Sequence, residues 1–295
     1  MRVLLLGASG FIGSAVRQQR PDWDWVCPAR ADLDLMDVDQ CSNFNVNVDV
    51  IVNCAGFYGG LVFNKIHADK IMYKNTAMFY NIVDMVERLK PKKFIQIGSA
   101  CIYPKSVTGV LTETDLTSTD FHESVIYSAL AKHYQLKSLQ QKKWAWDYLI
   151  LTNVYGPGES LDPVHSHFVG SVINRLLSDN SQFTMMGTGE AVRDFLYIND
   201  AAKIICKFCE LLTGTCEPVN VSTGVGNSIK ELTLQLIPAS TNLIWGSEKD
   251  NGTLFKVLSN KKMLSIIGDV DFLDVQQGLS NTLEFYQTWL TTNDK

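Results

Sequence analysis

The stretch Arg2-Val3-Leu4-Leu5-Leu6-Gly7-Ala8-Ser9-Gly10-Phe11-Ile12-Gly13 decides the fold that we expect for this chain. A short, mostly apolar run leads into three glycines with the spacing G-x-x-G-x-x-G, and a helix is predicted to begin at about Phe11. Glycines allow a tight turn and let the backbone approach a pyrophosphate, whose negative charge a helix N-terminus stabilises. The pattern therefore predicts a dinucleotide-binding loop that uses Gly7, Ser9, Gly10, Phe11, Ile12 and Gly13.

The composition is that of a globular protein. Hydrophobic residues make up 46% and charged residues 19% of the 295 residues, which excludes a disordered chain. The formal charge of −5 and the lack of a Lys/Arg run argue against a nucleic-acid partner. No apolar stretch approaches the length of a membrane span, and Met1 leads directly into a strand. We therefore expect neither a membrane partner nor a signal peptide.

Seven cysteines form no disulfide framework in a chain of this length, which predicts a reducing, cytoplasmic environment. Cys206 and Cys209 have the C-x-x-C spacing, but they lie in an apolar, helix-like stretch without a second pair. We predict a packed helix face there and no metal site.

Strands and helices alternate along the chain, with connections long enough for right-handed crossovers. Further strands are expected over residues 23–27, 49–56, 146–152 and 219–224, helices over 68–89, 124–142 and 166–177, and a loop over the site at 59–64. The pattern predicts an α/β fold: a doubly wound parallel sheet of the Rossmann type with a smaller α+β substrate-binding lobe. We expect residues 1–160 to form the dinucleotide-binding domain, residues 190–225 to return to it, and residues 161–295 to form mainly the lobe.

The end of the second predicted strand bears on the choice of cofactor. An acidic residue there would bind the adenosine ribose 2′-OH, whereas an arginine suits a 2′-phosphate. Arg30 comes first and Asp32 follows two residues later, which favours NADP(H); the alternative is that Arg30 is only a surface charge. Ala55 and Gly56 are small residues at the end of the third strand and leave room for the cofactor.

Residues 94–104 read FIQIGSACIYP, a buried strand followed by a hydroxyl, a thiol and a phenol. Ligands of open α/β sheets bind outside the carboxyl ends of the strands. Ser99 and Cys101 are therefore expected to face a ligand. The alternative is a strand end followed by a turn of small residues.

Several motifs together resemble the extended short-chain dehydrogenase/reductases that act on nucleotide sugars. The glycine triplet, Ser99, a helix with Tyr127 and Lys132, and the run Asn153-Val154-Tyr155-Gly156-Pro157 carry this resemblance. Residues 98–104, GSACIYP, are similar to the GSSCIYP signature of the GDP-L-fucose synthases. Further matches, at both ends of the chain, are Gly59-Gly60, His165-Ser166-His167, Gly187-Thr188-Gly189, Arg193-Asp194-Phe195-Leu196 and Asp250-Asn251-Gly252-Thr253.

The resemblance implies an NADPH-dependent epimerase/reductase that converts a GDP-4-keto-6-deoxy sugar, such as GDP-4-keto-6-deoxy-mannose, to GDP-L-fucose or a close relative. Tyr127 would supply the proton for the reduced oxygen if the Lys132 ammonium lowers the pKa of its phenol. Ser99 would orient the carbonyl. The resemblance assigns epimerisation to Cys101 and His167, and a Cys101 thiolate requires neighbours that lower its pKa.

The resemblance also implies binding roles. Arg193 and Arg175 would hold the diphosphate or the sugar, Asn153 would contact the sugar nucleotide, and Lys256 is a weaker candidate; the alternative for each arginine is a surface ion pair. Met186 stands where the family carries an aromatic residue against guanine. Cofactor contacts are implied for the glycine loop, Arg30, Ala55, Gly56, Tyr127, Lys132, Asn153, Val154 and His167. A homodimer through the helices at 68–89 and 124–142 is expected.

One spacing departs from the family. Tyr127 and Lys132 are five residues apart instead of four, which places them about 140° apart around a regular α-helix. A π-bulge would restore a shared face, Tyr127 at the helix start need not be helical, or Ser128 has replaced the tyrosine. We expect a preserved couple. The alternatives are a sugar-nucleotide-binding protein without reductase activity and an NAD-dependent 4-epimerase or dehydratase.

Overall fold

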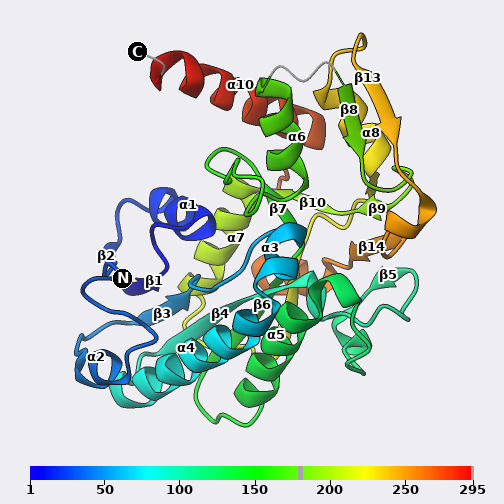
Figure 1. Cartoon of the computed structure of the whole chain (residues 1–295). Helices are drawn as coiled ribbons and strands as arrows, with labels where there is room; N and C mark the ends of the chain where they lie inside the picture. Colours follow the sequence, from blue (N-terminus) through cyan, green and yellow to red (C-terminus); the bar gives the residue numbers. More distant parts are fainter. Residues whose placement is uncertain (179–181, 294–295) are drawn as a thin grey trace.

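Six parallel strands form the central sheet of the computed structural model, which describes residues 1–178 and 182–293 (Figure 1). The strand order is β11-β6-β4-β3-β1-β2. These strands are β1 (Arg2–Leu6), β2 (Asp24–Val26), β3 (Val50–Asn53), β4 (Lys93–Ser99), β6 (Trp146–Leu151) and β11 (Pro218–Val221). Each adjacent pair runs parallel. The prediction of a doubly wound parallel sheet is confirmed.

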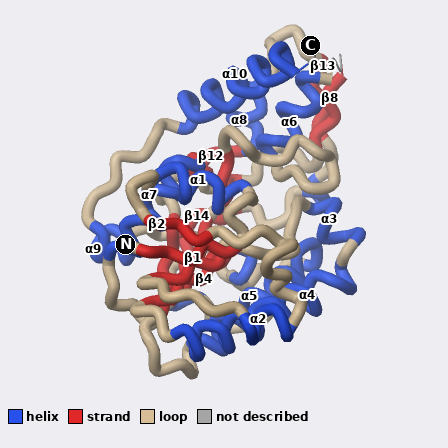
Figure 2. Tube along the Cα trace, turned by 90° about the vertical axis from the view of Figure 1, so that its left-hand side faces the viewer, coloured by secondary structure: helices blue, strands red, loops and turns tan. Residues whose placement is uncertain are grey.

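Helices cover both faces of the sheet (Figures 1 and 2). One layer contains α1 (Phe11–Gln19), α7 (Ile198–Glu210) and α9 (Lys261–Ile267), and the other contains α2 (Val38–Asn43), α4 (Ala68–Leu89) and α5 (Ile126–Leu139). Side chains alternate along a strand, so Val3 and Leu5 of β1 pack into the core beneath α1 and α7. Leu4 and Leu6 pack into the core on the α4 and α5 side. Burial on both faces explains the unbroken apolar run in β1.

A smaller lobe lies beyond the sheet, at the top of Figure 1. It contains α6 (Phe168–Leu177), α8 (Ile229–Leu236), α10 (Val275–Asn293) and the parallel pair β8 (Gln182–Met185) and β13 (Asn242–Trp245). These elements share a third apolar core. The pair β7 (Asn153–Tyr155) and β10 (Phe195–Tyr197) contributes to this core and stands between the lobe and the sheet.

A second small sheet joins segments that are far apart in sequence. Its order is β12-β9-β14-β5, made of β5 (Val110–Leu111), β9 (Val192–Arg193), β12 (Asn227–Ser228) and β14 (Phe255–Leu258). The remaining elements are α3 (Leu61–Ile66) and the 3₁₀ turns η1 (Ala100–Ile102), η2 (Glu113–Asp115), η3 (Glu123–Val125) and η4 (Glu248–Asp250). Among the helices of the described residues, none is long and apolar enough to cross a membrane.

Local signals placed most elements correctly. The long helix runs from Ala68 to Leu89 as predicted, and Ser228 caps α8 through a reciprocal pair of hydrogen bonds with Glu231. Cys206 and Cys209 are buried in α7, which confirms the packed helix face. The predicted loop over residues 59–64 is wrong, because helix α3 begins at Leu61 immediately after the glycine pair.

Candidate active site

The glycine loop connects β1 to α1. Gly7 has a φ of +77°, which favours glycine, and a Cβ there would lie 2.6 Å from the backbone nitrogen of Ala55. A Cβ on Gly13 would lie 2.2 Å from the carbonyl oxygen of Gly7. Larger residues at these two positions would push the loop away from β3 and from the helix. The glycines therefore set the close approach of β1, β3 and α1.

This loop fits the diphosphate of a dinucleotide. Gly10 is the N-cap of α1 and brings no capping side chain, so N–H groups of the first helical turn are available to an anion. β1 stands between β2 and β3, where the strand order reverses, and such a switch point forms the crevice in which open α/β sheets bind ligands. The structure brings residues 7–13 together with Ala55 and Gly56 at this point. The Phe11 ring also lies near Gly158 in the turn after β7.

Arg30 follows β2 on an exposed loop. Its guanidinium pairs with Asp34 at 3.3 Å, and 80% of its side chain is exposed. The Asp32 carboxylate accepts a hydrogen bond of 3.3 Å from the Ala29 N–H. Arg30 is free to turn toward a 2′-phosphate because a surface ion pair of this kind contributes little. Its cofactor role stays a prediction.

The carboxyl end of β4 carries Ser99 and Cys101. Ser99 Oγ accepts a long hydrogen bond of 3.5 Å from the Cys101 N–H, and both residues are partly exposed. Next to them the buried Lys132 donates to the Ile97 carbonyl at 3.5 Å. Burial lowers the pKa of Lys132, and charge on the nearby Cys101 thiol opposes this shift. The strand end and helix α5 thus bring a hydroxyl, a thiol and an amine together.

Tyr127 does not join this group. Helix α5 is α-helical from Ile126 to Leu139, so the π-bulge that would bring Tyr127 onto the face of Lys132 is not there. Tyr127 is 44% exposed, whereas Ser128, four residues before Lys132, is buried. Helical geometry therefore gives Ser128 the position on the face of Lys132. The expected pairing of Tyr127 with Lys132 is therefore not found. Ser128 occupies the helical position, four residues before Lys132, that the tyrosine was expected to occupy.

Two cations from the small sheet face the same region. Arg193 of β9 and Lys256 of β14 are register partners, and burial lowers the pKa of both. Besides burial, the charge of Arg193 lowers the pKa of Lys256, and charge on Cys101 opposes this shift. Within residues 1–178 and 182–293, neither cation makes an ion pair; Arg193 donates to its neighbour's carbonyl, Val192 O, at 2.8 Å. Such a pair suits a polyanionic ligand.

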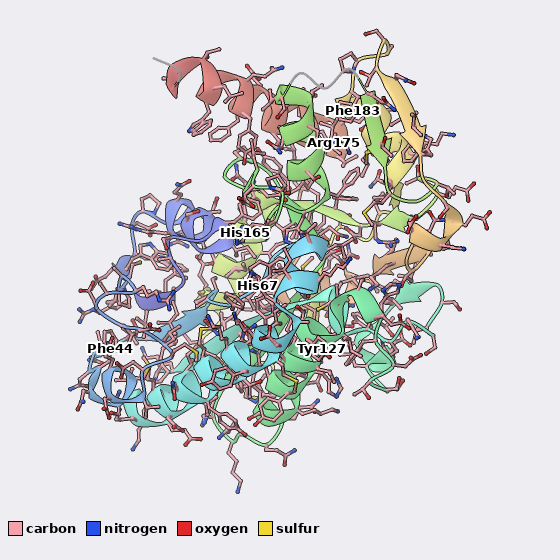
Figure 3. All side chains as sticks on the ribbon, in the orientation of Figure 1. Phe44, His67, Tyr127, His165, Arg175 and Phe183 are labelled. Carbon is pink, nitrogen blue, oxygen red and sulfur yellow. The ribbon has the colours of Figure 1, made fainter. Side chains whose placement is uncertain are left out.

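Other predicted binding residues lie in the lobe and in β7. Arg175 of α6 stacks over the Phe183 ring at 4.7 Å and donates to Met185 Sδ at 3.5 Å (Figure 3). The surface ion pair that was the alternative for Arg175 is not among the contacts of the described residues. Met186 is 67% exposed. Asn153 donates to the Asp194 carbonyl at 2.8 Å, and Val154 packs between two cores.

His167 begins helix α6 and is held by a carboxylate. Its backbone N–H donates to Glu159 Oε1 at 3.0 Å, and the residue itself is exposed. Burial raises the pKa of Glu159 to about 7, although hydrogen bonds from backbone N–H groups oppose that rise. Gly60 donates to the His165 carbonyl at 3.2 Å, so the glycine pair contacts the histidine motif, and Figure 3 shows His165 beside α3.

Sequence reasoning missed the polar residues that shape the site. Tyr58, Asn64, Asn75 and Glu159 are isolated in sequence, and no spacing pattern marks them. The Lys132 ammonium lies over the ring of Tyr58, 4.1 Å from the ring centroid. The one available signal was the aromatic pair Phe57-Tyr58 between a strand end rich in small residues and a glycine pair.

The chain is similar to known proteins over most of its length. Residues 3–221 match the NAD dependent epimerase/dehydratase family. The chain is 27% identical to the GDP-L-fucose synthase of Escherichia coli strain K12, covering 100% of this chain and 98% of that protein. It is 24% identical to the GDP-L-colitose synthase of Yersinia pseudotuberculosis, covering 97% and 98%.

Solved structures share the fold. A GDP-6-OMe-4-keto-L-xylo-heptose reductase from C. jejuni superposes with a TM-score of 0.88 at 20% identity, covering 98% of each chain. A GDP-L-fucose synthetase from Naegleria fowleri bound to NADP gives 0.85 at 22% identity, covering 100% of this chain and 95% of that one. The family match spans the glycine loop, the end of β4, helix α5 and β11, which are the elements that build the site. The chain belongs to the NAD dependent epimerase/dehydratase family.

Proposed function

We propose that the protein is an NADPH-dependent epimerase/reductase acting on a GDP-4-keto-6-deoxy sugar, with GDP-4-keto-6-deoxy-mannose as the first substrate to test. One observation carries the proposal: Ser99 and Cys101 stand at the end of β4, the strand whose Ile97 carbonyl accepts from the buried Lys132, while Arg193 and Lys256 are paired in the small sheet. Groups suited to proton transfer thus lie beside a pair of cations suited to a diphosphate. The curated relatives named GDP-L-fucose synthase and GDP-L-colitose synthase, aligned over nearly the whole chain, support the substrate class.

Different residues of the chain bind different parts of the cofactor. The loop at residues 7–13 binds the diphosphate, Ala55 and Gly56 leave space beside it, and Arg30 binds the 2′-phosphate. Val154 and Asn153, in the strand beyond β6, line the nicotinamide end together with Lys132. When bound, NADPH supplies the hydride for reduction.

Ser99 donates a hydrogen bond to the keto oxygen and stabilises the charge that develops there. For epimerisation, Cys101 removes a proton beside the ketone and His167 returns one to the opposite face. His167 is exposed, so its imidazole can take up a proton from solvent before it acts as an acid. Its position at the start of α6, fixed by Glu159, supports a defined orientation.

Two cations of the small sheet, Arg193 and Lys256, bind the substrate. Arg193 and Lys256 hold the diphosphate, since a guanidinium fork and an ammonium both pair with phosphate oxygens. Asn153 contacts the sugar, and the exposed Met186 packs against the base. Arg175 reaches the ligand only if it leaves the Phe183 ring.

A second candidate is a sugar-nucleotide-binding protein that has lost the reductase step. The presence of Ser128 on the face of Lys132, with Tyr127 exposed, favours this candidate. It predicts binding of nucleotide sugar and NADPH without turnover.

One experiment separates the two candidates. The protein is incubated in D₂O with NADPH and GDP-4-keto-6-deoxy-mannose, and the products are followed by NMR beside a calorimetric binding assay. Deuterium at C3 and C5 reports epimerisation, and loss of the ketone with NADPH oxidation reports reduction. Binding without loss of the ketone supports the second candidate, and the absence of both binding and reaction refutes the two proposals together.

Three further assignments complete the proposal. Residues 1–160 with 190–225 act as the cofactor domain, and 161–295 act mainly as the substrate lobe. The protein works in the cytoplasm, which the seven free cysteines of the described chain support.

It forms a homodimer through α4 and α5, where Tyr73 and Tyr80 are 66% and 50% exposed. Light scattering tests the dimer, and charged substitutions at these two tyrosines should dissociate it.

A further inference from the structure

The position of Lys132 raises the question of which phenol serves this site. Ser128 has no aromatic ring, and Tyr127 is exposed on another side of α5. Tyr58 lies in the loop between β3 and α3, and its ring receives the Lys132 ammonium at 4.1 Å from the centroid. Helix α5 places no aromatic ring beside Lys132. The loop between β3 and α3 places the Tyr58 ring there instead.

The loop that carries Tyr58 is fixed on both sides of this residue. Asn75 of α4 accepts from the Phe57 N–H at 2.7 Å and donates to the Phe57 carbonyl at 2.9 Å. Asn64 of α3 donates to the carbonyls of Gly59 and Gly60 at 3.0 Å each. Buried amides that use both donor and acceptor leave the backbone little freedom. Tyr58 is thus held in a preorganised loop.

The ring position also depends on the residue before the loop. A Cβ on Gly56 would lie 2.5 Å from the Tyr58 ring, so the ring rests directly against the Gly56 backbone. Gly56 and Lys132 contact the ring from the strand end and from the helix. The phenol therefore stands at the carboxyl end of the sheet, where the nicotinamide end of a dinucleotide is expected.

The Tyr58 hydroxyl is buried and makes no hydrogen bond of good geometry to the residues that the structure describes; the Gln135 side chain is the neighbour that comes nearest to one. Burial raises the pKa of the phenol, charge on Cys101 raises it further, and the Gln135 amide opposes both. The titratable groups that face it are Cys101 of η1, Tyr148 of β6 and Lys132 of α5. A buried donor without a partner is costly in a native structure. A ligand oxygen would supply the missing acceptor once the hydroxyl turns toward the crevice.

We infer that Tyr58 is the proton donor of the reductase step, in the role that Tyr127 was expected to fill. The inference rests on the proposed function. The carbonyl π bond breaks as hydride from NADPH forms the C4–H bond, the Tyr58 O–H bond breaks, and its proton forms the O4–H bond. NADPH is oxidised and the ketone is reduced. The Lys132 ammonium stabilises the resulting phenolate, whose charge spreads into the ring, and a proton from solvent restores the phenol.

Substitution of the two tyrosines tests this inference. Tyr58→Phe keeps the ring and removes only the hydroxyl, and we expect kcat for ketone reduction to fall by roughly 10²- to 10⁴-fold, the range for general acid catalysis. The melting temperature should change little, because the deleted hydroxyl makes no hydrogen bond of good geometry among the described residues. Tyr155→Phe, which removes a hydroxyl that donates to the Val275 carbonyl, is the matched control for kcat. Full activity of Tyr58→Phe, or the loss in Tyr127→Phe instead, would overturn the inference.

A second readout does not depend on turnover. Protein labelled with [¹³Cζ]tyrosine is observed by NMR at neutral pH with NADP⁺ bound, and the Tyr58 signal is assigned by its loss in Tyr58→Phe. We expect the Tyr58 signal to shift in Lys132→Met, because the ammonium no longer lies over the ring. A signal that does not respond to the lysine contradicts the inference. If the wild type reduces no 4-keto nucleotide sugar, the proposed function fails, and this comparison still decides whether Tyr58 and Lys132 are coupled.

Discussion

Ser128 donates a hydrogen bond of 2.6 Å to Oδ1 of Asn64 and so joins helix α5 to helix α3. Asn64 uses its amide nitrogen to hold Gly59 and Gly60. The hydroxyl on the face of Lys132 therefore supports the loop on the other side of the crevice. Ser128 holds Asn64, and Asn64 holds the loop that carries Tyr58, so the residues at positions 128 and 58 are connected through Asn64.

Ser128→Ala should destabilise the protein by about 1–3 kcal/mol, because the buried Asn64 Oδ1 loses its donor. Urea unfolding followed by fluorescence measures the change. Ser280→Ala on the exposed side of α10 removes a similar hydroxyl and should stay within about 0.5 kcal/mol of the wild type. Equal effects of the two substitutions would show that the bond to Asn64 contributes nothing.

Lys93→Met should cost about 3–5 kcal/mol of unfolding free energy. Lys93 pairs with Asp147, both side chains are fully buried, and the ammonium also donates to the carbonyls of Phe208 and Leu211 at 2.7 and 2.6 Å. Its removal leaves the Asp147 carboxylate buried without its cation. The matched control is Lys92→Met, which breaks an exposed pair with Asp49 and should cost less than about 1 kcal/mol. Similar midpoints for the two variants in a denaturant series would contradict this expectation.

Stability should rise as the pH falls from 7 toward 4.5, in part through Glu159. Burial raises its folded-state pKa to about 7 from the ordinary 4.5, so the folded protein binds a proton in this window that the unfolded chain does not. The slope from one such group is at most about 1.4 kcal/mol per pH unit. Glu159→Gln should remove the contribution of Glu159 to the slope of unfolding free energy against pH. Glu284→Gln, at an exposed position, should leave that slope unchanged. Denaturant titrations at pH 5, 6, 7 and 8 check this, and an unchanged slope in Glu159→Gln would refute it.

Arg30→Ala should raise KM for NADPH by roughly 10- to 100-fold and leave that for NADH nearly unchanged, as loss of one charge-assisted phosphate contact predicts. Arg2→Ala, at the opposite end of β1, removes a comparable exposed arginine that pairs with Asp24 and serves as the control. Steady-state kinetics with both cofactors give the ratio. Loss of affinity for both cofactors alike would mean that Arg30 does not read the 2′-phosphate.

Lys256→Met should weaken binding of GDP by roughly tenfold and leave NADPH binding intact, because the lysine stands with Arg193 in the small sheet and away from the glycine loop. Isothermal titration with each ligand separates the two effects. Lys249→Met in the neighbouring 3₁₀ turn is a control of the same charge. Equal losses for GDP in both variants would indicate a general effect of charge.

The sequence by itself determined the architecture and the location of the site. The apolar run before Gly7, the glycine spacing and the alternation of strands and helices are local signals, and local backbone preferences translate them directly into β1, α1 and the parallel sheet. Ser99 and Cys101 were predicted to follow a strand end, and they stand at the carboxyl end of β4, the edge that the carboxyl ends of parallel strands share.

Only the tertiary structure decided which side chains meet there. The register of α5 turns Tyr127 away and Ser128 inward, and a loop seventy positions earlier brings Tyr58 onto Lys132. Arg175 pairs with the Phe183 ring because α6 packs against β8. The raised pKa of Glu159 arises from its burial in the lobe. Side-chain contacts of this kind depend on helix rotation and on packing between distant segments, and one-dimensional spacing encodes neither.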